Sequence, residues 1–125
     1  MADEGMTSTY RIGEPFGKAL RRVRTALADA DLEICGEWDL ASNIRDTLMV
    51  SLPPCVVLFA SSAACAGEDV LADPPAAAMV PFHIVVSACG SETEVHFLKA
   101  LPAVGQLQGA VSRAVEKIGR RVLEV

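Results

Sequence analysis

The sequence has few aromatic residues: 5% of its 125 positions are Phe, Trp or Tyr, although 51% are hydrophobic. Its apolar content therefore comes mostly from Ala, Val and Leu, which we expect to form a core or to be covered in part by a partner. Positive charge is also scarce, since 11 Lys and Arg face 16 Asp and Glu, for a net charge of −5. This balance argues against nucleic-acid binding, which needs clustered positive charge.

Several functional motifs are missing. The four cysteines form no CxxC pair, and no basic segment followed by an apolar one lies near Met1. We therefore expect a cytoplasmic chain with reduced thiols and no secretory signal. The glycines never form the GxGxxG or GxxxxGK patterns that hold phosphates, and the histidines form no HxH or HExxH pattern. We expect no cofactor.

An uncharged run from Thr47 to Gly67 is long enough for a membrane-spanning helix. Pro53-Pro54 interrupts it, and serines and Cys55 dilute it. A buried strand over Cys55–Ser61 explains the same residues better, because this segment is apolar on both faces, as a central strand is. We expect no association with a membrane.

The most informative pattern is a β-hairpin. Two runs rich in β-branched and aromatic residues, 82–89 and 92–98, flank Gly90-Ser91. A two-residue loop sets Cys89 opposite Glu92 and divides the side chains between two faces. The face expected to join the core carries Phe82, Ile84, Val86, Ala88, Thr93, Val95 and Phe97. The other face carries His83, Val85, Ser87, Glu94, His96 and Leu98.

Other segments have the periodicity of strands or helices. We expect strands over 7–12 and 32–40, the second with Leu32, Ile34 and Trp38 inward. A first long helix, opened by Pro15 and ending near Ala30, has an apolar side of Phe16, Leu20, Val23 and Leu27. A second, from Gln106 to about Leu123, has an apolar stripe that includes Val111, Val115, Ile118 and Val122.

Two short helices complete the pattern, one capped by Ser42 or Asn43 and one over 63–71. The order predicts an α+β fold: an antiparallel sheet of about five strands with two long helices on one face, strand–helix–four strands–helix with short helical insertions. We expect residues 1–6 to be flexible and 7–125 to form one domain. The sheet face away from the long helices is apolar, which predicts a homodimer unless the short helices cover it.

Residues 8–100 carry a family pattern, in the helix from Phe16 to Leu27 and in the segments Glu37-Trp38-Asp39-Leu40, Ile44–Leu48, Val56–Ala60 and Leu71–Pro74. In these segments the chain resembles the family called domain of unknown function 302. The resemblance implies a strand–helix–four strands–helix fold of the TATA-binding-protein-like group, often homodimeric, in bacterial or archaeal cytosol. It implies no activity.

The chain departs from that family at two places. The family commonly has Asn-Pro after the third strand and Pro-Cys at the start of the fourth. Here the chain has Ser62-Ala63-Ala64-Cys65 and Pro81-Phe82. No site residue is therefore carried over from the family.

Three groups of residues are candidates for chemistry. His83 and His96 share a face with Glu94 and together offer a zinc or iron site or a pH sensor, unless they are simply sheet histidines. Cys65, near an expected helix start, offers a reactive thiol, whereas Cys35, Cys55 and Cys89 are interpreted as core residues. Basic residues of the two long helices offer an anion site or form a solvated face: Arg21, Arg24, Arg113 and Lys117, with Lys18, Arg22, Arg120 and Arg121.

These patterns predict a small, non-enzymatic cytoplasmic domain that self-associates and binds a small molecule between its sheet and helices. Two alternatives stay open. One is a thiol- or metal-dependent enzyme that uses Cys65 or His83 and His96. The other is a regulator that binds a nucleotide or another anion.

Overall fold

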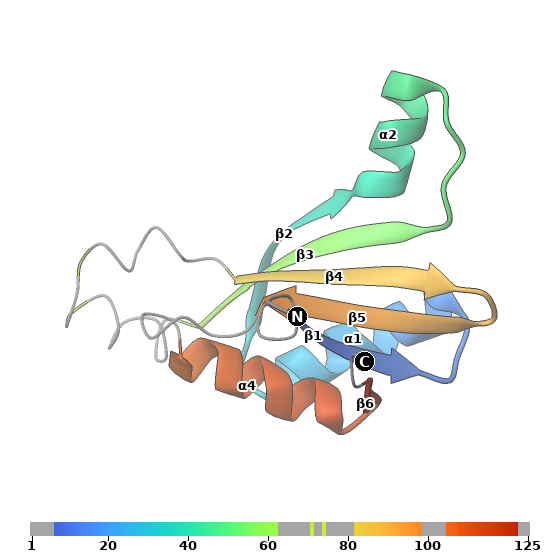
Figure 1. Cartoon of the computed structure of the whole chain (residues 1–125). Helices are drawn as coiled ribbons and strands as arrows, with labels where there is room; N and C mark the ends of the chain where they lie inside the picture. Colours follow the sequence, from blue (N-terminus) through green and yellow to red (C-terminus); the bar gives the residue numbers. More distant parts are fainter. Residues whose placement is uncertain (1–6, 63–70, 72–73, 75–81, 99–104, 123–125) are drawn as a thin grey trace.

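The computed structural model describes residues 7–62, 71, 74, 82–98 and 105–122. Within these residues six strands form one antiparallel sheet in the order β2-β3-β4-β5-β1-β6 (Figure 1). The strands are β1 Thr7–Ile12, β2 Glu33–Asp39, β3 Cys55–Ser61, β4 Phe82–Cys89, β5 Glu92–Leu98 and β6 Arg120–Val122. The helices are α1 Phe16–Asp29, α2 Leu40–Leu48 and α4 Gly105–Glu116. The α+β prediction is confirmed, with one strand more than the five expected.

The β4–β5 hairpin has the predicted register. Cys89 pairs with Glu92 and Val86 with Val95, so the loop is Gly90-Ser91. Gly90 has a φ of +63°, which glycine adopts without steric strain. Of the face predicted to join the core, every residue is buried except Ala88, which is half-buried. The alternation of the sequence was sufficient to assign both faces.

Helices α1 and α4 cover one face of the sheet (Figure 1). The β3 side chains on this face are Val56, Leu58 and Ala60, all buried. Tyr10 of β1 is also buried, and its hydroxyl donates to Glu116 Oε1 at 3.2 Å, which ties the sheet to the end of α4. The core lies between sheet and helices and comprises Tyr10, Ile12, Ala19, Val23, Ala26, Leu27, Leu32, Val56, Leu58, Ala60, Phe82, Ile84, Val86, Val95, Phe97, Leu107, Ala110, Val111, Ala114 and Val115.

The opposite face of the sheet, which we call the open face, is defined by two rows of residues paired across the strands. The first row crosses all six strands through Val122, Thr9, His96, Val85, Val57 and Trp38. The second crosses five strands, from β6 to β3, through Arg120, Arg11, Glu94, Ser87 and Cys55. The open face therefore has an apolar side at β2 to β4 and a polar side at β5 to β6.

The sequence predicted that Trp38 points inward, and this prediction is wrong. Ile34 pairs with Ala60, but Gly36 pairs with Phe59, so a β-bulge at Cys35 shifts the register of β2. An extra residue in a strand exchanges the faces of all the side chains that follow it. Ile34 therefore faces the core, whereas Trp38 lies on the open face and is 44% exposed.

The C-terminal helix is shorter than the sequence predicted. It ends at Glu116, and Arg120–Val122 pair with β1 as β6, so Val122 belongs to a strand. A Cβ atom on Gly119 would lie 3.0 Å from the carbonyl oxygen of Arg11. Glycine at this position thus allows the chain to leave the helix and approach the edge of the sheet closely.

Helix α2 and the loop that follows it, residues 40–54, stand out from the sheet at the ends of β2 and β3 (Figure 1), and we call them the arm. The cap of α2 is Asp39, whose Oδ1 accepts from the backbone N–H of Ser42 at 3.0 Å, and not Ser42 or Asn43 as predicted. The helix therefore starts earlier than expected, and Figure 1 shows it projecting beyond the sheet instead of lying over the open face. The second short helix, predicted over 63–71, lies outside the described residues except for Leu71. In the part of the chain that is described, no helix has the length and apolarity needed to cross a membrane.

Candidate functional site

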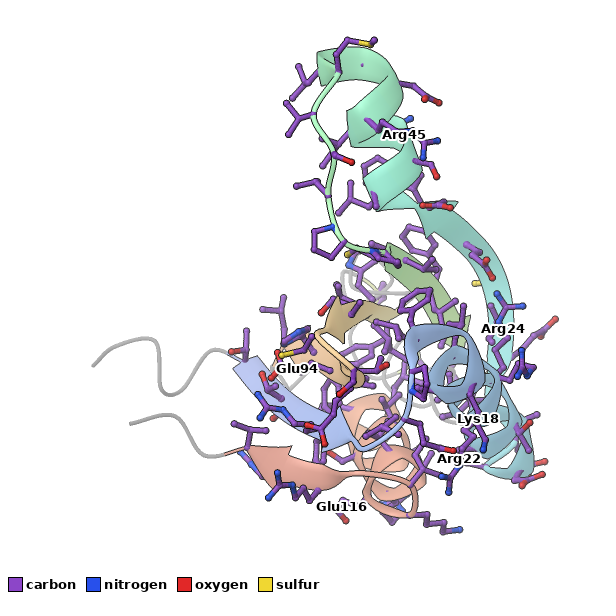
Figure 2. The ribbon with its side chains drawn as sticks, turned by 90° about the vertical axis from the view of Figure 1, so that its right-hand side faces the viewer. Lys18, Arg22, Arg24, Arg45, Glu94 and Glu116 are labelled. Carbon is purple, nitrogen blue, oxygen red and sulfur yellow. The ribbon has the colours of Figure 1, made fainter. Side chains whose placement is uncertain are left out.

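A basic groove of about 520 Å³ runs between α1 and the end of α4. Its lining includes four of the chain's 11 basic residues, Lys18, Arg21, Arg22 and Lys117. Ala26 and Ile118 give it an apolar floor, and Thr25 and Asp29 add a hydroxyl and a carboxylate. Figure 2 shows Lys18 and Arg22 together on α1, with Arg24 farther along toward β2. Basic side chains are thus concentrated in one place on a chain with a net negative charge.

The cations of this groove differ in their partners. Lys18 and Arg22 both form ion pairs with Glu14, at 3.3 Å in the case of Lys18. The hydrogen bond from Arg22 lowers the pKa of Glu14, and Lys18 lowers it further, against a smaller opposing effect of burial. Arg21 and Lys117 make no ion pair with any described residue. Two positive charges in the groove therefore have no ion-pair partner within the described part of the chain.

The predicted anion candidates are only partly brought together. Arg21 and Lys117 line the same groove, as expected if the two helices pack side by side. Arg24 instead forms an ion pair with Glu37 of β2. Arg113 lies back along its own helix, with Nη1 3.3 Å from the position of a Cβ atom on Gly109.

His96 lies at the centre of the polar side of the open face. Its Nδ1 is 3.1 Å from Thr9 Oγ1, and its Nε2 is 3.1 Å from Ser87 Oγ. Glu94 Oε1 is 3.6 Å from Nε2, and the other oxygen of this carboxylate pairs with Arg11. Both ring nitrogens are therefore engaged within the sheet, which favours a structural role.

His83 is separated from this cluster by its own contacts. It is exposed, and its ring packs edge-on against Phe59 at a centroid distance of 5.1 Å. Glu94 contacts His96 as predicted, but among the described residues no three His, Cys, Asp or Glu side chains are close enough to hold a metal ion.

The cysteines occupy different environments from those predicted. Cys35 and Cys89 are exposed, and only Cys55 is half-buried, so none of the three is fully in the core. Burial raises the pKa of the Cys55 thiol, and the negative charge of Asp39 raises it further. All three are free thiols. Cys65, the thiol candidate, lies outside the described residues.

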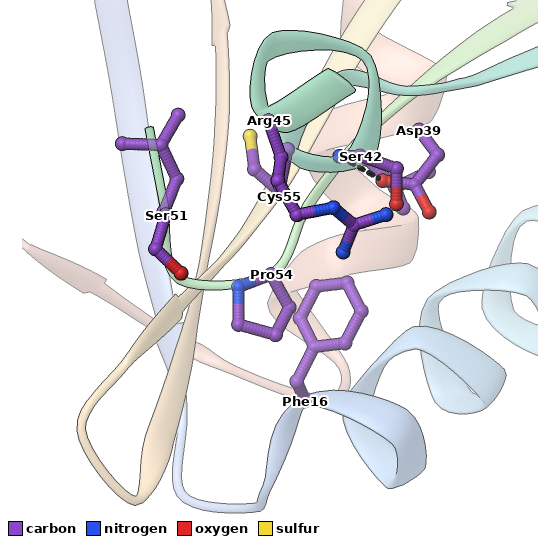
Figure 3. Close-up of a pocket in the computed structure, with 10 residues that line it drawn as sticks. Phe16, Asp39, Ser42, Arg45, Ser51, Pro54 and Cys55 are labelled. Atoms are coloured by element: carbon purple, nitrogen blue, oxygen red, sulfur yellow. Dashed lines mark hydrogen bonds between the residues drawn. The ribbon is translucent and has the colours of Figure 1, made fainter. Parts of the chain in front are cut away.

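A small cavity of about 190 Å³ lies at the base of the arm, between α2 and the start of β3. Figure 3 shows the Arg45 side chain extending from α2 with its guanidinium above the Phe16 ring, on the side of Ser42 and Asp39. Leu52 and Val56 also line it. The cavity joins the arm to the start of α1, and it was not predicted because these segments are far apart in the sequence.

The comparisons with known proteins concern the whole fold. A family model described as "Domain of unknown function DUF302" matches residues 7–125. The structure is similar to the crystal structure of an uncharacterized conserved DUF302 protein from Bacillus stearothermophilus, with a TM-score of 0.80 and 11% identity. That similarity covers 90% of this chain and 97% of the other. No curated protein matches the sequence.

Proposed function

The chain belongs to the DUF302 family, described as a domain of unknown function, and we propose that it is a non-catalytic cytoplasmic domain that pairs with a second copy of itself through its open face. One observation carries the proposal: Trp38, Val57 and Val85 form a continuous apolar row on the open face, in which Trp38 is 44% exposed, Val85 is half-buried and Val57 is buried. Leu98, on the same face, is 52% exposed. The free thiols of Cys35, Cys55 and Cys89 support a reducing compartment.

A two-fold contact suits this surface, because one apolar patch then serves both copies. The charged residues of the open face also largely neutralise one another within the same chain. Arg11 pairs with Glu94 and lies 3.8 Å from Glu92, so the apolar row can be buried without stranding these charges.

Light scattering over a range of concentrations tests the pairing. The wild type should have twice the mass of one chain at micromolar concentration, and Val85→Glu should be monomeric with an unchanged circular dichroism spectrum. Ala28→Glu, on the exposed side of α1, is the matched control and should remain dimeric. A wild type that stays monomeric at all concentrations would exclude the proposal.

A second function is the binding of a small anion, such as a phosphorylated metabolite or a nucleotide, in the basic groove. Arg21 and Lys117, which form no ion pair with a described residue, favour it, and the groove also offers an apolar floor and the hydroxyl of Thr25. Hydrogen bonds to charged groups contribute about 1.5–3 kcal/mol each, so either cation matters measurably to affinity.

Isothermal titration with AMP and with inorganic phosphate tests this second function. Arg21→Ala and Lys117→Ala should each weaken binding about tenfold or more. Glu14→Gln should strengthen binding, because it releases Lys18 and Arg22 from their ion pairs. Arg24→Ala is the control, since this cation pairs with Glu37 outside the groove. Equal affinity in all four variants, or no binding by the wild type, would rule out the groove as an anion site.

A further inference from the structure

The arm ends in an apolar tip. Among the described residues seven large hydrophobic side chains are exposed, and four of them fall within residues 48–52: Leu48, Met49, Val50 and Leu52. Met49 is 86% exposed. The segment from Thr47 to Pro54 holds no charge. An exposed apolar patch of this kind, on an element that projects from the body, is typical of a surface that contacts a partner.

The backbone at Met49 supports the same interpretation. Met49 has a φ of +58° and ψ of 31°, the left-handed conformation that ends a helix, and its N–H donates to the carbonyl of Arg45 at 2.8 Å. Glycine usually occupies this position, because a side chain is strained there. The isolated chain gains nothing from a strained methionine that it leaves in solvent. A contact made by that flexible apolar side chain explains its presence.

The charges of the arm favour a second copy of this chain as the occupant. Within the arm the only charged residues are Arg45 and Asp46, which lie 3.4 Å apart and cancel. On the open face Arg11 and Arg120 balance Glu92 and Glu94. Two copies that each carry a net charge of −5 repel each other elsewhere. They can approach where both surfaces are neutral and apolar, namely at the arm tip and at the β2 to β4 side of the open face.

We propose that the arm tip of each copy packs on the open face of the other, beside the partner's Trp38. Trp38 directly precedes Asp39, the cap of α2, so it marks the base of the arm on the open face. A two-fold axis that sets two arms antiparallel brings each tip to the other arm's base, and it buries the 44% exposed Trp38 together with Met49. The inference rests on the proposed self-association and adds the element that makes the contact.

Two variants and one intrinsic probe test the exchange of arms. Met49→Gly removes the side chain and relieves the left-handed strain, so it should raise the Tm of the monomer by about 4 °C. Asp31→Gly is the matched control, because Asp31 also has a positive φ, of 61°, but lies at the end of α1 away from the arm. Trp38 is the only tryptophan, so its fluorescence reports the arm base without labelling.

The wild type should show a blue shift of Trp38 emission as concentration rises through the dimer Kd measured by sedimentation. Asp31→Gly should behave like the wild type. Met49→Gly should raise the dimer Kd about a hundredfold, because each of the two equivalent arm-tip contacts contributes about tenfold. The variant should also show no blue shift of Trp38 emission. Val50→Ser should also raise the dimer Kd, and it replaces Met49→Gly in the test if that variant does not fold.

The outcomes separate this inference from the self-association on which it rests. If Val85→Glu gives monomers while Met49→Gly and Val50→Ser dimerise like the wild type, the face pairs without the arm and the inference is wrong. If the wild type never dimerises, both fail. If a monomeric wild type binds phosphatidylcholine vesicles and Met49→Gly does not, the occupant of the tip is a lipid surface and the inference is again wrong.

Discussion

The rings of Tyr10 and Phe97 stack on neighbouring strands β1 and β5, with centroids 5.7 Å apart and planes inclined by 13°. Phe82 of β4 packs edge-on against Phe97 at 5.9 Å. Three of the chain's six aromatic residues thus meet beneath α1 and α4. Both ring–ring contacts within the described core therefore involve Phe97.

Phe97→Ala should lower the free energy of unfolding by about 3–5 kcal/mol, because it leaves a cavity beside two rings. Phe97 is 3% exposed, so we expect the loss of stability that is typical of a fully buried phenylalanine. Urea denaturation at a concentration that keeps the chain monomeric measures it. Leu98→Ala, the next residue and on the opposite face, is the control and should change stability by less than about 0.5 kcal/mol. A reversed order would mean that the faces of β5 are inverted.

Two glycines should respond to alanine with opposite signs. Gly119→Ala brings a methyl group 3.0 Å from the Arg11 carbonyl and 3.1 Å from Ile12 Cγ1, so we expect a loss of about 1–3 kcal/mol as β6 separates from β1. Gly17→Ala, in α1, meets no atom within 4 Å and should gain up to about 1 kcal/mol from helix propensity. Thermal unfolding compares the two. Equal effects would contradict the close approach at Gly119.

The contrast between β5 and β2 explains how much of the fold the sequence could predict. The hairpin alternates without interruption on either side of a two-residue loop, so pattern alone assigned its register and faces. In β2 the alternation continues through Cys35, and nothing local marks the bulge that turns Trp38 outward. The prediction of a C-terminal helix that continues to about Leu123 failed for a related reason. Ile118 and Val122 keep helical spacing, but the pairing of Arg120–Val122 with β1 overrides it.

The candidate site was predictable only in part because it depends on tertiary packing. Helical spacing placed Arg21 and Lys117 on amphipathic helices, and the packing of α1 beside α4 brought them into one groove. The same spacing could not show that Glu37 of β2 neutralises Arg24. The ion pair of Glu14 with Lys18 has a spacing of four but was not predicted, and that of Glu14 with Arg22, at spacing eight, is beyond the reach of a local pattern.

The cap of the arm gives a local prediction. Asp39→Ala removes the acceptor for the Ser42 N–H and should destabilise α2 by about 1 kcal/mol, whereas Asp39→Asn should retain most of the cap. Hydrogen exchange is the suitable measurement, because the arm stands apart from the core. Protection of the amides of Ile44 to Leu48 should fall in the alanine variant only. A uniform loss of protection over the sheet as well would show that the arm does not open by itself.

The acid stability of the chain should depend on Glu14. Arg22 and Lys18 hold the pKa of this carboxyl below its ordinary value, so the folded chain binds fewer protons at Glu14 than the unfolded chain in the acid range. The ion pairs therefore stabilise the fold fully above the unfolded pKa of about 4.3, and this contribution disappears as the pH falls through the lower, folded pKa.

Arg22→Gln removes the hydrogen bond that contributes most to the lowered pKa of Glu14. The variant should therefore raise this pKa toward its ordinary value, and NMR titration of the carboxyl measures the change. Its loss of stability relative to the wild type should be largest near neutral pH and should vanish in acid, where Glu14 is protonated in both proteins. Added salt should reduce the difference, because Arg22 is exposed. Arg24→Gln, which breaks a pair with Glu37 instead, should leave the pKa of Glu14 unchanged. If Arg22→Gln left the pKa of Glu14 unchanged too, Lys18 alone would have to account for its lowering against the opposing effect of burial, and the pairing of Arg22 with Glu14 would not persist in solution.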